Sequence, residues 1–254
     1  MDNNSQVVVI TGAAQGIGKG IAQRFSESGA KLALLDVRLQ PFEDWVGGLK
    51  TEFLTIKCDI SSKEDVLHAR EQVLSRFGCI DILVNNAGIG SAPCAFEDIK
   101  EEDWRQTIDV NLTGTFFCTQ VFGKSMLDRG GAIINISSQS GLIPSPNKGA
   151  YSVSKTGVIM LTQQTALSWG GRKVRANAVC PGIIETEMST RNYTTPNAKE
   201  ARMGLIPLGR IGTTEDIANV VFFLASPESE YINGEAIRID GGFSLTTIMQ
   251  LSRI

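Results

Sequence analysis

Seven short apolar runs recur along the chain, and the spacing between them leaves room for helices. The first run, Val7–Ile10, consists only of apolar residues, which is typical of a strand buried on both faces of a parallel sheet. The other runs lie at residues 31–36, 53–57, 80–84, 132–136, 174–179 and 236–239. This pattern predicts seven β-strands.

Segments with helical periodicity separate these strands, near residues 16–28, 63–77, 101–128, 150–170 and 214–225. Gly29 follows the first segment as a C-terminal cap should, and Pro41 limits the stretch after the second strand to a short helix. Such alternation predicts right-handed βαβ units. We therefore expect an α/β fold in one domain, residues 1–254, with a doubly wound (Rossmann-type), seven-stranded parallel sheet and helices on both faces.

The composition narrows the possible partners. Hydrophobic residues make up 42% of the 254 residues and charged residues 20%, the balance of a globular protein. The formal net charge is −3 without a basic run, so we expect neither nucleic acid nor an anionic membrane as a partner. The polar N-terminus and the lack of an apolar stretch of about 18 residues favour a cytoplasmic protein that binds a small molecule.

Cysteine and histidine provide no metal or redox pattern. The cysteines at 58, 79, 94, 118 and 180 are scattered singly, which is typical of buried free thiols. His68 is the only histidine and lies in a polar helical segment. We expect no metal site and no histidine-based catalytic triad.

A glycine loop directly follows the first predicted strand and opens the first helix. It reads Thr11-Gly-Ala-Ala-Gln-Gly-Ile-Gly18, and its G-x-x-x-G-x-G spacing differs from the commoner G-x-G-x-x-G. Glycines let the backbone approach a pyrophosphate, and the helix N-terminus offers unpaired N–H groups to the anion. The loop therefore predicts dinucleotide binding; a chance glycine cluster in a turn is the alternative.

An acidic residue ends the second strand at the place where an adenosine ribose is usually bound. Asp36 lies 36 − 18 = 18 residues after Gly18 and can accept hydrogen bonds from the ribose diol, while its charge would repel a 2′-phosphate. Gln15 adds no positive charge to the loop, although Arg38 is close enough to leave some tolerance for NADP. We expect NAD as the cofactor, unless Asp36 serves only a turn.

Candidate catalytic residues follow the fifth predicted strand. Tyr151 and Lys155 are four residues apart and share one helical face, and Ser138 lies 151 − 138 = 13 residues before Tyr151. A tyrosine–lysine pair alone is a weak signal, and Asn111 alone would be a buried amide. The combination is what points to a site.

Taken together, these residues resemble the classical short-chain dehydrogenase/reductase family, from about residue 6 to residue 243. The matching features are the Thr11–Gly18 loop, Asn85-Asn86-Ala87-Gly88, Asn111, Ser138, Tyr151, Lys155, Pro181-Gly182 with Thr186, and Asp240-Gly241-Gly242. The resemblance implies hydride transfer between NAD and a secondary alcohol or ketone. It implies the catalytic residues Asn111, Ser138, Tyr151 and Lys155. The cofactor residues it implies are Gly12, Gln15, Gly16, Ile17, Gly18, Asp36, Asp59, Ile60, Asn86, Ala87, Gly88, Tyr151, Lys155, Pro181, Gly182, Ile184 and Thr186.

The chemistry that this resemblance implies makes demands on each group. A phenol with a pKa near 10 must lose about 2 to 3 units to act as a base at neutral pH. We expect the charges of Lys155 and of oxidised nicotinamide to favour the Tyr151 phenolate. Ser138 would hydrogen-bond the substrate oxygen. By resemblance, Asn111 holds a water that relays protons, Lys155 also holds the nicotinamide ribose, and Ile184 and Thr186 bind the carboxamide.

Polar side chains surround the expected substrate position. The substrate candidates are Ser138, Gln139, Asn147, Lys148, Tyr151 and Arg191, with a lid at 187–210. They favour a polar substrate such as a sugar, polyol or hydroxy acid, unless Lys148 and Arg191 lie in solvent. Arg202 and Arg210 are expected to be solvated or structural, because glutamates crowd the same lid.

Two rival functions and one assembly stay open. The first rival is an NADH-dependent reductase of 3-oxoacyl thioesters, and the second is a non-catalytic nucleotide-binding sensor, which would be expected to lack the tyrosine or lysine. By resemblance, the helices at 101–128 and 150–170 pair with copies of themselves in a homotetramer. The apolar tail at 243–254 fits a subunit contact or packing on its own chain.

Overall fold

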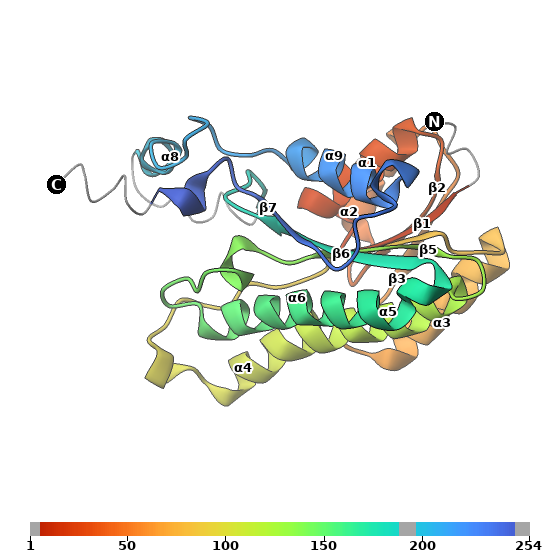
Figure 1. Ribbon diagram of the computed structural model, residues 1–254, viewed down its shortest axis with the longest axis horizontal. Helices are drawn as coiled ribbons and strands as arrows, with labels where there is room; N and C mark the ends of the chain where they lie inside the picture. Colours follow the sequence, from red (N-terminus) through yellow and green to blue (C-terminus); the bar gives the residue numbers. More distant parts are fainter. Residues whose placement is uncertain (1–5, 188–196, 247–254) are drawn as a thin grey trace.

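A single parallel sheet forms the centre of the molecule (Figure 1). The computed structural model describes residues 6–187 and 197–246. Within them the sheet contains β1 (Val7–Thr11), β2 (Lys31–Asp36), β3 (Phe53–Lys57), β4 (Ile82–Asn85), β5 (Gly131–Ile136), β6 (Val174–Pro181) and β7 (Ala236–Ile239). The strand order is β3-β2-β1-β4-β5-β6-β7, and every pairing is parallel. The predicted seven-stranded sheet is confirmed.

Helices cover both faces of this sheet, as predicted. They are α1 (Gly16–Glu27), α2 (Gln40–Glu43), α3 (Lys63–Phe77), α4 (Glu101–Ile108), α5 (Thr115–Gly123), α6 (Gly149–Trp169), α8 (Ala198–Met203) and α9 (Thr214–Ala225). In Figure 1, α1 and α9 lie on one side of the sheet and α3, α5 and α6 on the other. Alternate residues of β1 serve the two cores: Val8 and Ile10 pack with the α1 and α9 side, and Val7 and Val9 with the α3 and α5 side.

The helix predicted at 101–128 is not continuous. A π-helical stretch, Asp109–Gly114, separates α4 from α5. Its extra residue per turn accommodates Asn111, whose amide Nδ2 donates to the Ile89 carbonyl at 2.9 Å and whose Oδ1 accepts from the Ile89 N–H at 2.8 Å. Hydrogen bonds from Asn111 to a neighbouring loop thus coincide with the break in the helical ladder, a tertiary contact that helical periodicity does not contain.

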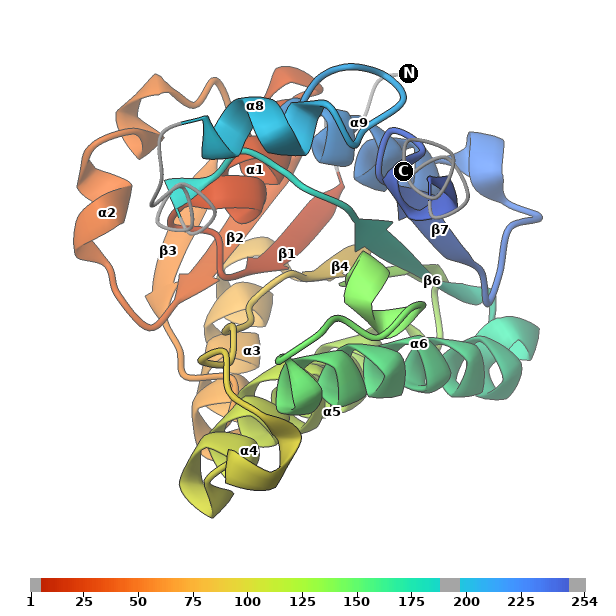
Figure 2. The same ribbon diagram turned by 90° about the vertical axis from the view of Figure 1, so that its left-hand side faces the viewer.

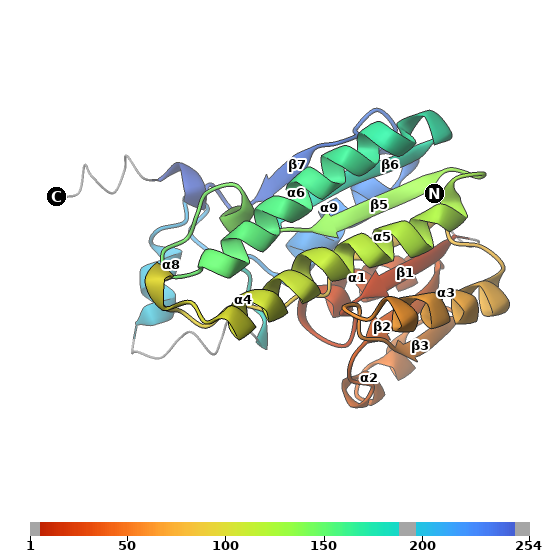
Figure 3. The ribbon, with the colours of Figure 1, turned by 90° about the horizontal axis from the view of Figure 1, so that it is seen from below.

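The carboxyl ends of the strands face the reader in Figure 2, with α8 above them and α4 and α6 below. Seen from below in Figure 3, α4 and α5 follow one another along one line, and α6 runs beside them across the sheet. The predicted lid at 187–210 lies partly outside the described residues, and its described part contains α8. The predicted tail at 243–254 is described only as far as Thr246, so its packing stays a prediction.

Within the two described ranges, no helix combines the length and the apolar character needed to cross a membrane. The cytoplasmic location stays a prediction.

Candidate active site

The end of β1 is fastened to the end of β4 by four hydrogen bonds. The Asn86 side-chain amide donates to the carbonyls of Thr11 at 3.0 Å and Gly12 at 2.9 Å. The Thr11 hydroxyl accepts from the backbone N–H groups of Asn86 and Ala87, each at 3.0 Å. The glycine loop therefore has a fixed position at the edge where ligands bind in open parallel sheets.

Two of the loop glycines leave no space for a side chain. Gly12 has a φ of +63°, and a Cβ there would lie 2.7 Å from the Ala87 Cα. A Cβ on Gly18 would lie 2.2 Å from the Gly12 carbonyl oxygen. The loop thus has no side chains at these two positions and packs closely in front of the N-terminus of α1. A pyrophosphate can bind there to backbone N–H groups.

A cavity of about 760 Å³ runs along this edge and collects most of the predicted site residues. Those that line it are Gly12, Gln15, Gly16, Ile17, Asp36, Asp59, Ile60, Asn86, Ala87, Gly88, Ser138, Gln139, Lys148, Tyr151, Lys155, Pro181, Gly182, Ile184 and Thr186. Gly18 and Asn111 lie behind its wall. Asn147 is exposed and lies outside the cavity, and Arg191 falls outside the described residues.

At the β2 end of the cavity, the Asp36 carboxylate is held by backbone donors. It accepts from the Ala14 N–H at 3.2 Å and from the Arg38 N–H at 3.1 Å. The Arg38 guanidinium reaches across to the Gln15 side-chain oxygen at 3.0 Å. A negative and a positive side chain thus flank the place expected for the adenosine ribose.

The catalytic candidates meet at the other end. Tyr151 and Lys155 lie on α6, and Ser138 follows β5. The Lys155 side chain is 5% exposed, and its Nζ donates to the Ile136 carbonyl at 2.9 Å. A Cβ on Gly88 would lie 3.1 Å from the Asn111 Oδ1 and 3.3 Å from the Lys155 Nζ. Glycine at this position therefore leaves space for the ends of the lysine and asparagine side chains to lie beside the same backbone.

Comparison with known proteins agrees with this geometry. Residues 12–244 match a family model described as enoyl-(acyl carrier protein) reductase. The chain belongs to the short-chain dehydrogenase/reductase family. It is 39% identical over 241 residues to a 3-oxoacyl-(acyl-carrier-protein) reductase of Thermotoga maritima, covering 93% of this chain and 97% of that one. Its identity to a D-threitol dehydrogenase of Mycolicibacterium smegmatis is 37%, covering 95% and 94% of the two chains.

A solved structure of the same family superposes closely on this short-chain dehydrogenase/reductase. It is a 3-ketoacyl-(acyl-carrier-protein) reductase from Brucella melitensis in complex with NADH. The TM-score is 0.87 at 33% identity, with 94% of this chain and 98% of that one covered. The predicted family and fold are confirmed.

Burial controls the protonation states in the site of this oxidoreductase. It raises the pKa of the Tyr151 phenol, and a hydrogen bond with the Ser138 side chain acts in the opposite direction. Burial also lowers the pKa of Lys155 to about 8. The expected fall in the pKa of Tyr151 is thus not found in the protein alone, because loss of hydration outweighs the stabilisation of the phenolate by the serine. The protein by itself holds the phenol as an acid.

A second lysine lies near the same ring. The Lys148 Nζ lies 5.7 Å from the centroid of the Tyr151 ring, and the Lys155 Nζ lies 5.8 Å from it. Among the described residues, the Lys148 ammonium makes no hydrogen bond or ion pair, so its charge faces the cavity without a protein anion beside it. The sequence left open whether Lys148 lies in solvent, and the structure places it on the cavity wall.

Several further residues line the cavity that were not named as site residues from the sequence, although Glu187 and Arg202 fall in the predicted lid. They are Val37, Arg38, Cys58, Ile89, Gln106, Val110, Ile136, Ser137, Ser140, Ile183, Glu187 and Arg202. Most are chain neighbours of predicted residues at strand ends, which is a usable signal. Gln106 and Val110 are four residues apart and precede Asn111, so helical spacing would have indicated them. Arg202, expected in solvent or in a structural contact, had no such signal.

The raised pKa of Tyr151 predicts different pH dependences for the two reaction directions. Oxidation needs the phenolate to accept a proton, so its kcat/KM should rise from about pH 6 to about pH 9. Ketone reduction needs the protonated phenol and should not rise over that interval. Both profiles are measured at saturating cofactor, with samples returned to neutral pH to exclude unfolding. An oxidation rate that falls with increasing pH would contradict this assignment.

Proposed function

We propose that this oxidoreductase transfers a hydride between NAD(H) and a secondary alcohol or ketone, with a sugar, polyol or hydroxy acid as the substrate. The observation that carries the proposal is that Tyr151, Ser138 and Lys155 share one cavity with the glycine loop. A nucleotide sensor would need none of the three. Their joint presence at the end of a dinucleotide cavity supports catalysis.

Each residue has a role that its position allows. Tyr151 moves the proton to or from the substrate oxygen, and the Ser138 hydroxyl hydrogen-bonds that oxygen. Lys155 keeps a positive charge near the phenol, with its Nζ 5.8 Å from the centroid of the Tyr151 ring, and is placed to hold the nicotinamide ribose. Asn111, which contacts Ile89 and Ser154, fixes the wall beside Gly88. When bound, an oxidised nicotinamide supplies the hydride acceptor and a further positive charge.

NAD is proposed as the cofactor in preference to NADP. Both Asp36 oxygens already accept backbone N–H groups, which holds the carboxylate in place to accept hydroxyl donors from a ribose and to repel a 2′-phosphate. Arg38 partly offsets that repulsion, since its guanidinium binds Gln15 at the same edge. The related structure from Brucella melitensis was solved with NADH.

Polar groups at the substrate end support a polar substrate. Lys148 places an ammonium beside Tyr151 that pairs with no anion among the described residues, and Gln139 adds an amide to the same wall. The similarity to a D-threitol dehydrogenase agrees with a polyol. The alternative, reduction of a 3-oxoacyl thioester with NADH, is favoured by the similarity to the Thermotoga maritima reductase and uses the same catalytic residues.

The reaction is tested by following NAD reduction with sugars, polyols, hydroxy acids and 3-hydroxyacyl thioesters. We expect turnover with at least one of the first three classes, and we expect Tyr151→Phe to lose it by about a hundredfold or more while NAD still binds. Lys148→Gln should raise KM for anionic substrates and leave KM for neutral polyols unchanged. Turnover confined to the thioesters would favour the alternative, and a fully active Tyr151→Phe would refute the mechanism.

Replacement of the ribose carboxylate tests the choice of cofactor. Asp36→Ala removes the charge that repels a 2′-phosphate and leaves Arg38 nearby. We therefore expect the ratio of kcat/KM for NADP to that for NAD to increase by about tenfold or more. Asp59→Ala is a suitable comparison, because Asp59 lines the cavity and is also acidic. Equal ratios in wild type and Asp36→Ala would count against the assignment.

A homotetramer is proposed as the assembly. On α6, Val153, Met160 and Leu167 recur every seven residues and are 46%, 63% and 81% exposed. Such an apolar stripe on one helix fits burial against another copy of the chain. Light scattering should give four times the chain mass, and Met160→Glu should give a smaller species, whereas Met160→Leu should not. A monomeric wild type would exclude this assembly.

A further inference from the structure

The chain after β6 is supported by a short parallel segment from far along the sequence. We call residues 181–187 the carboxamide segment and residues 211–213 the support segment. The Glu185 N–H donates to the Gly212 carbonyl at 2.8 Å, and the Gly212 N–H donates to the Ile183 carbonyl at 3.0 Å. These bonds form an isolated parallel bridge outside the main sheet.

The two segments are closely packed against each other. A Cβ on Gly212 would lie 2.6 Å from the Ile184 Cδ1, so a larger residue there would force the Ile184 side chain to shift. Ile184 is 7% exposed and lines the cavity, and its side chain belongs to the core between the sheet, α1 and α9. A shift of the support segment would therefore displace Ile184 directly.

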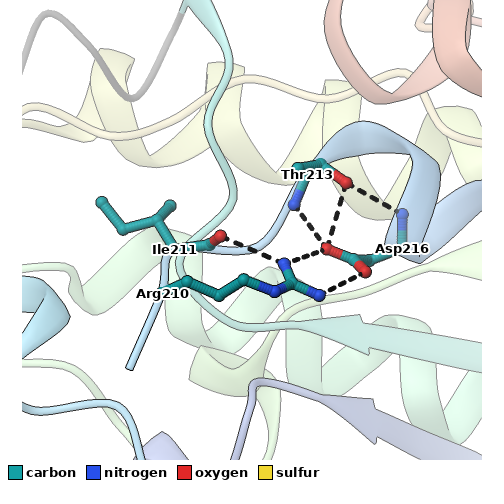
Figure 4. A network of polar contacts seen from close by, with 4 residues as sticks. All are labelled: Arg210, Ile211, Thr213 and Asp216. Carbon is teal, nitrogen blue, oxygen red and sulfur yellow. Dashed lines mark hydrogen bonds and ion pairs between the residues drawn. The ribbon is translucent and has the colours of Figure 1, made fainter. Parts of the chain in front are cut away.

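The support segment is closed into a fixed turn by one ion pair (Figure 4). The Arg210 guanidinium donates to both oxygens of the Asp216 carboxylate, at 2.7 and 2.8 Å. It also donates to the Ile211 carbonyl at 3.3 Å. The same carboxylate accepts from the Thr213 N–H at 2.7 Å and the Thr213 hydroxyl at 3.0 Å. Arg210 and Asp216 thus enclose the support segment between them.

Asp216 also belongs to the first turn of α9. Its N–H donates to the Thr213 Oγ1 at 3.2 Å, which completes a capping box. A hydrogen bond with the Arg210 guanidinium holds the pKa of Asp216 well below its usual range, so the pair stays charged throughout the neutral range. The turn formed by the support segment is therefore held in a fixed position at the start of α9.

The start of α9 lies against α1, the helix that begins with the glycine loop. A Cβ on Gly20 of α1 would lie 2.8 Å from the Thr214 Cβ of α9. At the cavity itself, a Cβ on Gly16 would lie 3.7 Å from the Thr186 Cγ2, so the carboxamide segment and the glycine loop are neighbours. The ion pair thus joins a rigid frame, α1 with α9, to the segment that faces the nicotinamide end.

We propose that Arg210 is a positioning residue: through its pair with Asp216 and the support segment, it fixes Ile184 and Thr186 for the nicotinamide half of the cofactor. Arg210 is not among the residues that line the cavity. The proposal rests on the NAD site proposed above. It assigns to an exposed ion pair a function at the cofactor, which stabilisation of the fold alone would not provide.

Arg210→Gln tests the proposal, because it removes the ion pair and leaves the Thr213–Asp216 capping box in place. Arg172→Gln is a matched control. Arg172 is 52% exposed, against 53% for Arg210, and it too binds an aspartate and a backbone carbonyl, but the pair connects the segments that follow α5 and α6. Arg210→Lys keeps the charge and should restore part of the function.

Two ligands separate positioning from general destabilisation. NAD carries the nicotinamide, whereas ADP-ribose carries only the adenosine diphosphate and the second ribose. For Arg210→Gln we expect the Kd of NAD to rise roughly three- to tenfold and kcat to fall, with the Kd of ADP-ribose unchanged within about twofold. Arg172→Gln should match wild type with both ligands. Binding is measured by calorimetry, together with the thermal midpoint of each variant.

Equal losses for NAD and ADP-ribose, or no loss for either, would overturn the proposal. Should Arg210→Gln not fold, the same comparison with Arg210→Lys decides, since a weaker but selective loss for NAD is expected there. A wild type that binds neither ligand would instead refute the proposed NAD site. Failure of the positioning role and failure of the cofactor assignment thus give different results.

Discussion

The hydrogen bonds between Thr11 and Asn86 set the geometry of the whole cavity. They join two strands that are neighbours in the sheet but far apart in the chain, at the point where the order of the strands changes direction. From this junction the glycine loop continues into α1 on one side, and Gly88 continues toward the catalytic groups on the other. Because both loops start from one fixed contact, the nucleotide end and the chemical end of the cavity are positioned relative to each other.

Desolvation raises the pKa of Tyr151 and lowers that of Lys155, the two ionisable groups of α6. It favours the neutral phenol of Tyr151 and the neutral amine of Lys155, so burial alone moves both away from the ion pair of phenolate and ammonium. The hydrogen bond from Lys155 to the Ile136 carbonyl helps to retain the ammonium in this environment. A second, more exposed ammonium on Lys148 adds positive potential near the ring. The protein alone therefore keeps the proton on the Tyr151 phenol, and a further positive charge nearby would favour its release.

The sequence predicted the sheet well because a strand covered on both faces must be continuously apolar, as Val7–Ile10 is. It also predicted most of the cavity, since parallel strands place their carboxyl ends at one edge. It was wrong about the continuity of the helix at 101–128, where contacts of Asn111 with a distant loop coincide with a π-helical turn. It expected the charges of Lys155 and of oxidised nicotinamide together to lower the pKa of Tyr151; in the protein alone burial raises that pKa, and spacing does not measure burial. Asn147 was expected at the substrate, yet its backbone adopts a left-handed conformation at the surface outside the cavity.

The bridge between Ile184 and Gly212 has a consequence for how such an enzyme can diversify. The two residues are 212 − 184 = 28 positions apart, yet they are hydrogen-bonded neighbours at the cofactor end of the cavity. The chain between them leaves and returns at one anchored point, so the entropic cost of closing it grows only slowly with its length. Changes in the predicted lid that leave Thr186 and Arg210 in place can reshape the substrate end while the cofactor half keeps its geometry. Selection on specificity can thus proceed largely independently of selection on hydride chemistry.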